Sequence, residues 1–478
     1  MKKISILLAV LLVVGCIFGG CTGSQESKPA ESQNQSSEES KDSTVPDEGY
    51  DGSAVTITFY HTMGQNLNSV LDEYIAEFNK LYPNITVEWT QVGGYNDVRD
   101  QIKTEITVGN QPNIAYCYPD HVALYNKAQA VQTLDELIAN KAEVTRADGT
   151  TEIMGLTEEQ IADYIEGFYA EGASFGDGLM YTLPFSKSTE VLYYNKTFFE
   201  ENKLEVPTTW DELYEVCKKI KAIDPECIPF GYDSEANWFI TLAEQIGSDY
   251  TSATGDHYLF DNETNRDLME KLNGWYNEGL LTTQALYGSY MSNIFKEKKL
   301  YLCIGSTGGS NYQVPDRVDG VYPWEVGVAP IPTFEGKELK AISQGPSVCI
   351  FKKSNKQEVY ASWLFVKYLT TSIEFQADFA RKSGYMPVIK SVDSDELFSE
   401  YLADADGGAN ISALCIKVGR ETNDAYFTSP AFVGSSTARD QVGSLLAKCL
   451  SFKEADGNIK DQIQKAFRDA IEECEYQD

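Results

Sequence analysis

A buried strand is predicted inside the stretch Leu179-Met180-Tyr181-Thr182-Leu183-Pro184-Phe185-Ser186-Lys187-Ser188-Thr189-Glu190-Val191-Leu192-Tyr193-Tyr194-Asn195-Lys196. The run at residues 191–194 combines β-branched and aromatic side chains, as strands commonly do. Pro184 has no backbone N–H to donate to a central ladder, so the chain is expected to bend before this strand. The polar residues 186–190 then form either a plain connection or a crossing between two lobes beside a ligand.

The first part of the chain alternates between strand and helix patterns. Strands are predicted at residues 55–60, 85–89 and 114–118, where β-branched and aromatic residues gather. Apolar residues recur at helical spacing in the two segments between them. This alternation predicts an α/β sheet with right-handed crossovers, and such sheets bind ligands at the carboxyl ends of their strands.

The overall composition is that of a globular, acidic protein. The 478 residues suffice for two or three lobes, and 42% of them are hydrophobic. The formal net charge of −33 argues against nucleic-acid binding, which needs Lys and Arg to neutralise phosphates. It also argues against docking on an anionic membrane through a basic face. We therefore expect the folded protein to contact a membrane only through a lipid anchor, for which the N-terminal residues provide a candidate.

The first 21 residues are predicted to be a lipoprotein signal peptide. A lysine pair precedes an apolar run at residues 4–14, which is too short to span a bilayer. The segment Phe18-Gly19-Gly20-Cys21 resembles a bacterial lipobox, whose cysteine is lipidated. Cys16 fits the same pattern, but only Cys21 is followed directly by polar residues, and an ordinary cleaved signal is the alternative. Residues 22–52 are expected to form a disordered tether.

Cysteine and histidine are placed in ways that argue against a metal site. The eight cysteines after Cys21 are widely and irregularly spaced, without a Cys-x-x-Cys pair. The three histidines, His61, His121 and His257, are not at ligand spacing from one another. We predict buried free thiols and neither a metal nor another cofactor.

Several further motifs follow one another along the chain. They are Phe59-Tyr60-His61-Thr62-Met63, Gly109-Asn110-Gln111-Pro112-Asn113-Ile114, Pro207-Thr208-Thr209-Trp210-Asp211-Glu212-Leu213, Gly327-Val328-Ala329-Pro330-Ile331-Pro332 and Ser383-Gly384-Tyr385-Met386-Pro387-Val388. Together with the stretch from Pro184 to Lys196, this ordered set resembles the extracellular solute-binding proteins of carbohydrate ABC importers. It is especially similar to the branch with glycerol-3-phosphate and glycerophosphodiester binders. The resemblance covers the chain from Val55 to its end.

The resemblance implies a fold, a division into lobes and a set of partners. The fold is the type II periplasmic-binding-protein fold, with two α/β lobes joined by several crossovers and closed by hinge motion around the ligand. We expect residues 53–186 and 304–355 in the first lobe, and residues 187–303 and 356–478 in the second. The implied partners are a small-molecule carbohydrate and the permease subunits of an ABC transporter. We expect a lipid-anchored monomer at the cell surface, with no enzymatic activity.

The candidate ligand-binding residues lie at predicted strand ends and in predicted crossovers. From the first strands come Tyr60, His61, Tyr95, Asp97, Tyr118 and Asp120, and from the crossovers come Ser186, Ser188, Glu190, Ser306, Thr307 and Gly345. The two aspartates are placed to accept hydrogen bonds from sugar hydroxyls, unless they are solvated loop carboxylates. The resemblance adds Trp238, Tyr385, Phe427 and Phe432 as aromatic walls. For Trp238 the alternatives are a stacking platform and an apolar anchor in the core.

One departure from the glycerol-3-phosphate binders bears on the ligand. Those proteins carry an arginine a few residues past a Phe-Thr pair, whereas this sequence has Phe432 near that position and Arg439 about two turns further on. A missing guanidinium fork favours a neutral sugar over a phosphate. The alternatives are a glycerophosphodiester binder of the same fold, a sensor that signals to a receptor, and a secreted glycosidase. A glycosidase needs two carboxylates about 5 to 10 Å apart.

Overall fold

The computed structural model describes residues 48–477. The predicted signal peptide, Cys21 and residues 22–47 of the predicted tether lie outside the described residues. Among residues 48–477, no helix is both long enough and apolar enough to cross a membrane. The seven cysteines from Cys117 to Cys449 are buried free thiols, as predicted, and Cys474 is buried as well.

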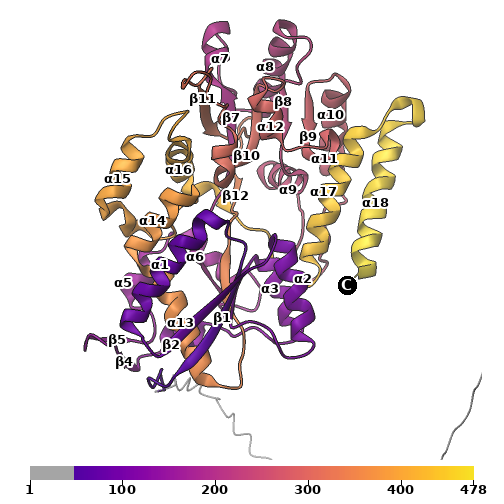
Figure 1. Ribbon diagram of the computed structural model, residues 1–478. Helices are drawn as coiled ribbons and strands as arrows, with labels where there is room; N and C mark the ends of the chain where they lie inside the picture. The colour runs from indigo at the N-terminus through magenta and orange to yellow at the C-terminus, as the bar shows by residue number, and fades with distance from the viewer. Residues whose placement is uncertain (1–47, 478) are drawn as a thin grey trace, which may run out of the picture. The chain divides into compact units, whose positions relative to one another are not determined.

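The first lobe is built around a five-stranded mixed sheet (Figure 1). In sheet order its strands are β2 (Ile85–Gln91), β1 (Val55–His61), β3 (Ile114–Cys117), β13 (Ser347–Ile350) and β6 (Thr182–Pro184). The connecting elements are α1 (Gln65–Leu81), α2 (Tyr95–Ile106), α3 (Pro119–Asn126), α4 (Asp135–Ala139), the hairpin β4 (Glu143–Thr145) and β5 (Thr151–Ile153), α5 (Glu158–Asp163), α6 (Glu166–Ala170) and η1 (Glu171–Ala173). The strands β2, β1 and β3 run parallel, as predicted, whereas β13 is antiparallel to both of its neighbours.

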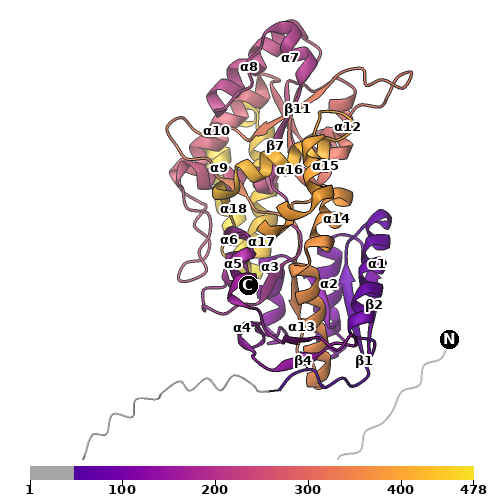
Figure 2. The same ribbon diagram turned by 90° about the vertical axis from the view of Figure 1, so that its left-hand side faces the viewer.

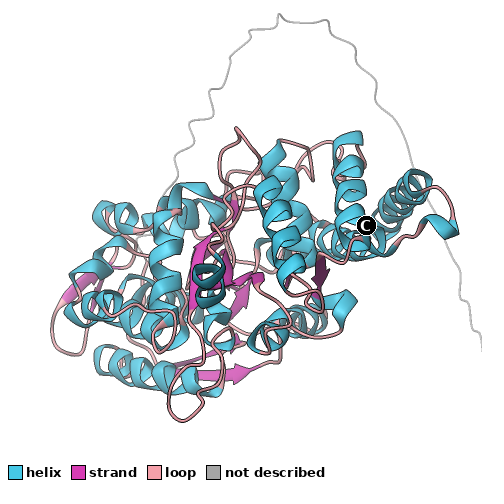
Figure 3. Cartoon of the chain, turned by 90° about the horizontal axis from the view of Figure 1, so that it is seen from above, coloured by secondary structure: helices cyan, strands magenta, loops and turns pink. Residues whose placement is uncertain are grey.

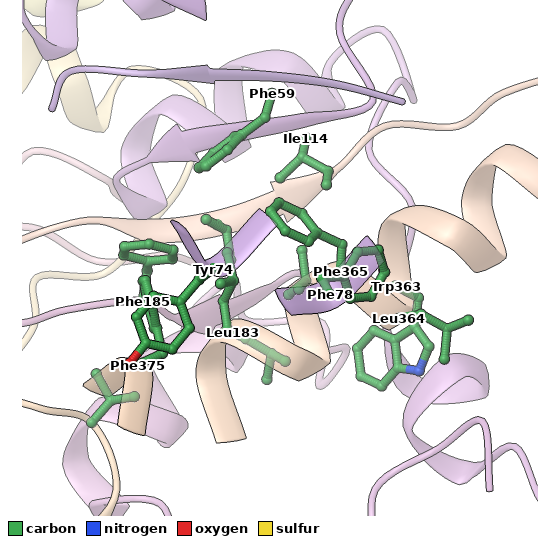
Figure 4. Close-up of a cluster of buried hydrophobic side chains, with 14 of the residues drawn as sticks. Phe59, Tyr74, Phe78, Ile114, Leu183, Phe185, Trp363, Leu364, Phe365 and Phe375 are labelled. Atoms are coloured by element: carbon green, nitrogen blue, oxygen red, sulfur yellow. The ribbon is translucent and has the colours of Figure 1, made fainter. Parts of the chain in front are cut away.

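Four elements that come late in the chain complete this lobe. They are α13 (Lys356–Thr371), α14 (Ile373–Ser383), η3 (Lys390–Ser394) and α15 (Glu396–Ala403). Figure 4 shows Trp363, Phe365 and Phe375 from these helices gathered with Phe59 of β1 and Phe78 of α1. The Phe78 and Phe365 rings lie 5.1 Å apart, edge to face. Burial of this aromatic cluster, at about 25 cal/mol for each Å² removed from water, fixes α13 and α14 on the first sheet.

The second lobe surrounds another five-stranded sheet. Its strands, in sheet order, are β11 (Val326–Pro330), β7 (Glu190–Asn195), β10 (Leu302–Ser306), β8 (Phe230–Tyr232) and β9 (Leu281–Thr283). The surrounding elements are α7 (Lys196–Asn202), α8 (Trp210–Ile223), α9 (Glu235–Ile246), α10 (Glu263–Asn277), α11 (Gln284–Tyr287), α12 (Met291–Lys296), η2 (Thr307–Tyr312), α16 (Ile411–Glu421), η4 (Asn423–Ala425), α17 (Ser435–Ser451), η5 (Glu454–Asp456) and α18 (Ile459–Gln477). Figure 3 shows these helices and those of the first lobe around the strands.

The chain passes between the two sheets at three places. The first passage, residues 185–189, joins β6 to β7, so the polar turn of the sequence is a crossing rather than a plain connection. The second joins β11 to β13 and contains β12 (Ala341–Ile342), which pairs with β14 (Tyr426–Phe427). The third runs from α14 and α15 to α16, and Figure 2 shows these helices in succession. The α/β class and the several crossovers are therefore as predicted.

Around Lys187, the first passage is hydrogen-bonded to the second passage and to the loop that follows α14. The backbone N–H of Lys187 donates to the carbonyl of Met386 at 3.0 Å, and that of Ser188 donates to the carbonyl of Gln344 at 2.9 Å. Gly345 has φ +87°, and a Cβ there would lie 2.6 Å from the Ser186 carbonyl oxygen. Only glycine fits this conformation and this close approach, so these segments form one joined hinge.

The lobe boundaries differ from those predicted in two places. The segment from residue 356 to Phe398 contributes to the core of the first lobe instead of the second. The strands β10 and β11 pair with β7 in the second sheet, so Ser306 and Thr307 do not belong to the first lobe. The glycine- and serine-rich turn after β10 does not lead back to the first sheet, because η2 packs against α16 in the second lobe.

Candidate functional site

A cavity of about 180 Å³ lies between the two lobes. Its wall combines hydroxyl, amide and charged side chains with aromatic and aliphatic ones. The lining residues are Tyr118, Pro119, Asp120, Glu171, Asn237, Ile240, Tyr250, Ile342, Ser343, Gln344, Thr428, Ser429, Pro430, Ser435 and Arg439. This combination of polar and aromatic groups is typical of small-molecule sites.

The first-lobe wall lies at the carboxyl end of β3, where the sequence predicted ligand-binding residues. Tyr118 caps α3, Pro119 fills its first position, and Asp120 lies in its first turn. Both Tyr118 and Asp120 are half-buried and line the cavity. A carboxylate in the first turn of a helix interacts favourably with the helix dipole.

A buried ion pair connects the cavity wall to the hinge. The Glu171 carboxylate accepts a hydrogen bond from the Lys187 ammonium, and the Lys187 side chain is fully buried. Glu171 also accepts from the hydroxyls of Ser343 at 3.2 Å, Ser347 at 3.1 Å and Thr428 at 3.0 Å. Its charge is therefore balanced within the protein. The sequence prediction missed Glu171, which lies in a short 3₁₀ turn after a polar segment.

A hydrogen-bonded relay runs through the second-lobe wall from β8 to α17. It consists of the side chains of Tyr232, Glu190, Asn237 and Arg439. The Tyr232 hydroxyl and the Asn237 amide, the latter at 2.8 Å, both donate to the carboxylate of Glu190. The Arg439 guanidinium donates to the side-chain oxygen of Asn237. Burial raises the pKa of Glu190 to about 7, against the opposing effects of these hydrogen bonds and of the nearby Arg439 charge. Glu190 was predicted to touch ligand, but it lies behind Asn237 instead.

Trp238 is a core residue, which corrects its prediction as a stacking platform. Its side chain is fully buried, and its ring stacks on Tyr232 at 4.9 Å with an interplanar angle of 13°. The rings of Phe230 and Trp210 complete its surroundings. The reason is that α9 is buried along several successive positions, from residue 237 to residue 243.

Phe432 is likewise not part of the cavity wall. It is buried and stacks on His257, with ring centroids 4.5 Å apart and an interplanar angle of 7°. Arg439, which the sequence placed too far along the chain, lines the cavity. A turn at residues 432–435 precedes α17, and the helix then brings Arg439 back toward Asn237. The cavity wall therefore does contain a guanidinium, which corrects the predicted absence of an arginine at the ligand.

The remaining first-lobe candidates do not line the cavity. His61 is fully buried, its Nδ1 accepts from the Met63 N–H at 3.1 Å, and burial lowers its pKa to about 4. Tyr60 donates to Glu105, and Asp97 accepts from the Gly94 N–H at 2.7 Å as part of the cap of α2. The Tyr95 ring lies 4.6 Å from that of the cavity residue Tyr118.

The remaining crossover candidates serve the hinge and its neighbouring turns. Ser186 and Ser188 are buried in the first passage. The Ser306 hydroxyl accepts from the Gly308 N–H at 3.2 Å, and Thr307 is fully buried. The Tyr385 ring lies against Gly308, where a Cβ would be 3.0 Å from the ring. Phe427 pairs with Ile342 in the strand pair β12 and β14, beside the cavity residue Thr428.

Known proteins with similar sequences include binding proteins for sn-glycerol 3-phosphate and for maltotriose. The periplasmic sn-glycerol-3-phosphate-binding protein UgpB of Escherichia coli strain K12 is 23% identical over 367 residues, which is 70% of this chain and 75% of that protein. The maltotriose-binding protein of Pyrococcus abyssi is 24% identical over 358 residues, covering 71% of this chain and 68% of that protein.

Solved structures show the same fold at low sequence identity. UgpB from Mycobacterium tuberculosis, in complex with glycerophosphocholine, superimposes with a TM-score of 0.70 at 16% identity and covers 89% of this chain and 99% of its own. The GacH receptor of Streptomyces glaucescens gives a TM-score of 0.68 at 18% identity, covering 88% and 98%.

These neighbours are two-lobed periplasmic binding proteins, so the predicted fold class is confirmed. A family model described as bacterial extracellular solute-binding protein matches residues 73–404, which include β3, the hinge at Lys187 and most of both lobes. This chain belongs to the bacterial extracellular solute-binding proteins.

Proposed function

We propose that this protein captures a carbohydrate in the cavity between its lobes and delivers it to an ABC importer. The observation that carries the proposal is the cavity wall itself. It offers the Asp120 carboxylate and several side-chain hydroxyls as acceptors, Arg439 and Asn237 as polar groups from the second lobe, and the aromatic side chain of Tyr118. Sugar hydroxyls both donate and accept hydrogen bonds, and the faces of sugar rings pack on aromatic side chains.

The hinge supports a capture mechanism that depends on closure. The cavity receives side chains from both lobes, so a ligand that bridges them favours the closed arrangement. The permease would then recognise the closed form. A lipid at Cys21 and the tether at residues 22–52 would keep the domain near the membrane of a Gram-positive cell surface, and we propose a monomer.

A glycerophosphodiester is the second candidate ligand, and a specific observation favours it. Arg439 lines the cavity and hydrogen-bonds to an uncharged amide, so its charge is available to a phosphate. A glycosidase has less support, because Glu171 is engaged by Lys187 and Glu190 lies behind Asn237. Hydrolysis of a glycoside by the purified protein would favour that alternative.

The first prediction is that a saccharide raises the melting temperature of the purified domain. A ligand at about 100 times its Kd stabilises the folded state by about 2.7 kcal/mol, because it binds only that state. We would measure thermal unfolding with maltotriose, glycerophosphocholine and sn-glycerol 3-phosphate in parallel. Stabilisation by phosphate-containing compounds alone would replace the carbohydrate proposal by the second candidate.

The second prediction separates the two aspartates that the sequence treated alike. Asp120→Asn should weaken ligand binding about 10- to 100-fold, since hydrogen bonds to a charged group contribute about 1.5 to 3 kcal/mol. Asp97→Asn is the matched control, because Asp97 caps α2 outside the cavity wall. Titration calorimetry with the ligand found above measures both. Equal affinities for the two variants would remove Asp120 from the site.

A further inference from the structure

Within residues 48–477, the Arg439 guanidinium forms no ion pair and instead donates to the side-chain oxygen of Asn237. The side-chain amide of Asn237 lies between Arg439 and the buried carboxyl group of Glu190. Because the guanidinium can only donate, the side-chain oxygen of Asn237 must face Arg439. The NH₂ group of Asn237 then faces Glu190, and the amide lies between the guanidinium and the carboxyl group.

We propose that Arg439 is a specificity-determining residue, and that Glu190 is a positioning residue that acts on it through Asn237. Among the residues that the structure describes, the guanidinium donates to one acceptor, the neutral side-chain oxygen of Asn237, and its other N–H groups remain for the ligand. The ligand must therefore present an acceptor oxygen at this point, from a hydroxyl pair or a phosphate. This inference rests on the proposed function, because it concerns the same cavity.

The groups around Glu190 link its ionisation to Arg439. Glu190 is buried on β7, with Tyr232 of β8 and Asn237 of α9 as its hydrogen-bond donors. The charged or titratable groups that face it are Arg439 on α17, Asp233 after β8 and Cys303 on β10. Arg439 is the cation among them, and its charge lowers the pKa of Glu190. A change in the distance between the two groups should therefore change that pKa.

Stability as a function of pH tests the relay without any ligand. The folded state keeps the Glu190 proton up to about pH 7, whereas an unfolded glutamate releases it near 4.5. The contribution of Glu190 to stability therefore falls as pH rises between these values. Glu190→Gln should remove that slope. Arg439→Met should extend the slope to higher pH, because it removes the nearby cation that lowers the pKa of Glu190.

A double-mutant cycle separates the relay from other effects of Arg439, such as its influence on Asp440. We would measure urea unfolding from pH 4.5 to 8.5 for the wild type, both single variants and the double variant. Arg439→Met should extend the pH-dependent loss of stability to higher pH in the wild-type background. This extension should disappear in the Glu190→Gln background. An identical extension in both backgrounds would overturn the coupling of Glu190 to Arg439.

Ligand affinity tests the specificity role, with whichever of maltotriose and glycerophosphocholine stabilises the wild type as the probe. We expect Arg439→Met to raise the Kd about 10- to 100-fold, and Glu190→Leu to raise it by a similar factor. Glu190→Gln should keep the Kd within about threefold of the wild type, because its side-chain oxygen still accepts from Asn237. A wild-type Kd for Arg439→Met would overturn the specificity role.

The outcomes distinguish a failure of this inference from a failure of the proposed function. Binding of a probe by the wild type, with no effect of Arg439→Met, refutes only the role of Arg439. If neither probe binds to the wild type, the proposed function fails, and the positioning of Arg439 by Glu190 is decided by the ligand-free pH cycle.

Discussion

Lys187→Met should lower the free energy of unfolding by about 3 to 5 kcal/mol. Lys187 is fully buried in the hinge, where its ammonium pairs with Glu171 and donates to the Ser347 hydroxyl at 3.0 Å. Removing the ammonium leaves the Glu171 carboxylate buried without a counter-charge, and an uncompensated buried charge costs about this much. The three hydroxyl donors to Glu171 remain, but they do not replace a full positive charge.

Two further variants show whether the loss comes from the unpaired charge. Lys187→Met combined with Glu171→Gln should recover much of the lost stability, because no buried charge is left behind. Lys196→Met is the matched control from the same stretch, since the Lys196 side chain is 42% exposed and pairs with Glu325 at 2.7 Å. It should change stability by less than about 1 kcal/mol. Urea unfolding measures all three, and equal effects of Lys187→Met and Lys196→Met would contradict the prediction.

The fold could be predicted because it depends on patterns that are local in the sequence. The strands at residues 55–61 and 114–117 show strand composition, and the turn at residues 186–189 is polar before an apolar strand. The lobe boundaries could not be predicted correctly from the sequence. Whether a strand after a glycine-rich turn pairs with one sheet or the other depends on contacts between distant segments, such as those of η2 with α16.

The candidate site was predicted only where it follows directly from the fold. Tyr118 and Asp120 are found at the cavity because ligands bind at the carboxyl ends of parallel strands. Arg439 and Glu171 were missed because their positions depend on tertiary packing. A turn before α17 determines which side of the helix Arg439 occupies, and a short 3₁₀ turn brings Glu171 to the buried Lys187. No local pattern indicates either arrangement.

Trp238→Ala should cost about 3 to 5 kcal/mol of stability in the unliganded protein. The indole is fully buried between Tyr232, Phe230 and Trp210, so truncation removes its apolar contacts and leaves a cavity in the core of the second lobe. The affinity of the folded fraction for ligand should change little by comparison. Trp238 is not a lining residue, although its neighbour in the chain, Asn237, is one.

The control for the loss of a tryptophan is Trp89→Ala. Trp89 is only half-buried on the edge strand β2, where its indole N–H donates to Asp72 at 2.8 Å, and its truncation should cost much less than that of Trp238. Urea unfolding of the unliganded variants and calorimetric titration with ligand provide the two readouts. A near-normal unfolding free energy for Trp238→Ala, together with a large loss of affinity, would show that the indole faces the ligand. That result would mean that the aromatic stack on Tyr232 opens when ligand binds, because a ring enclosed in the core cannot otherwise reach the cavity.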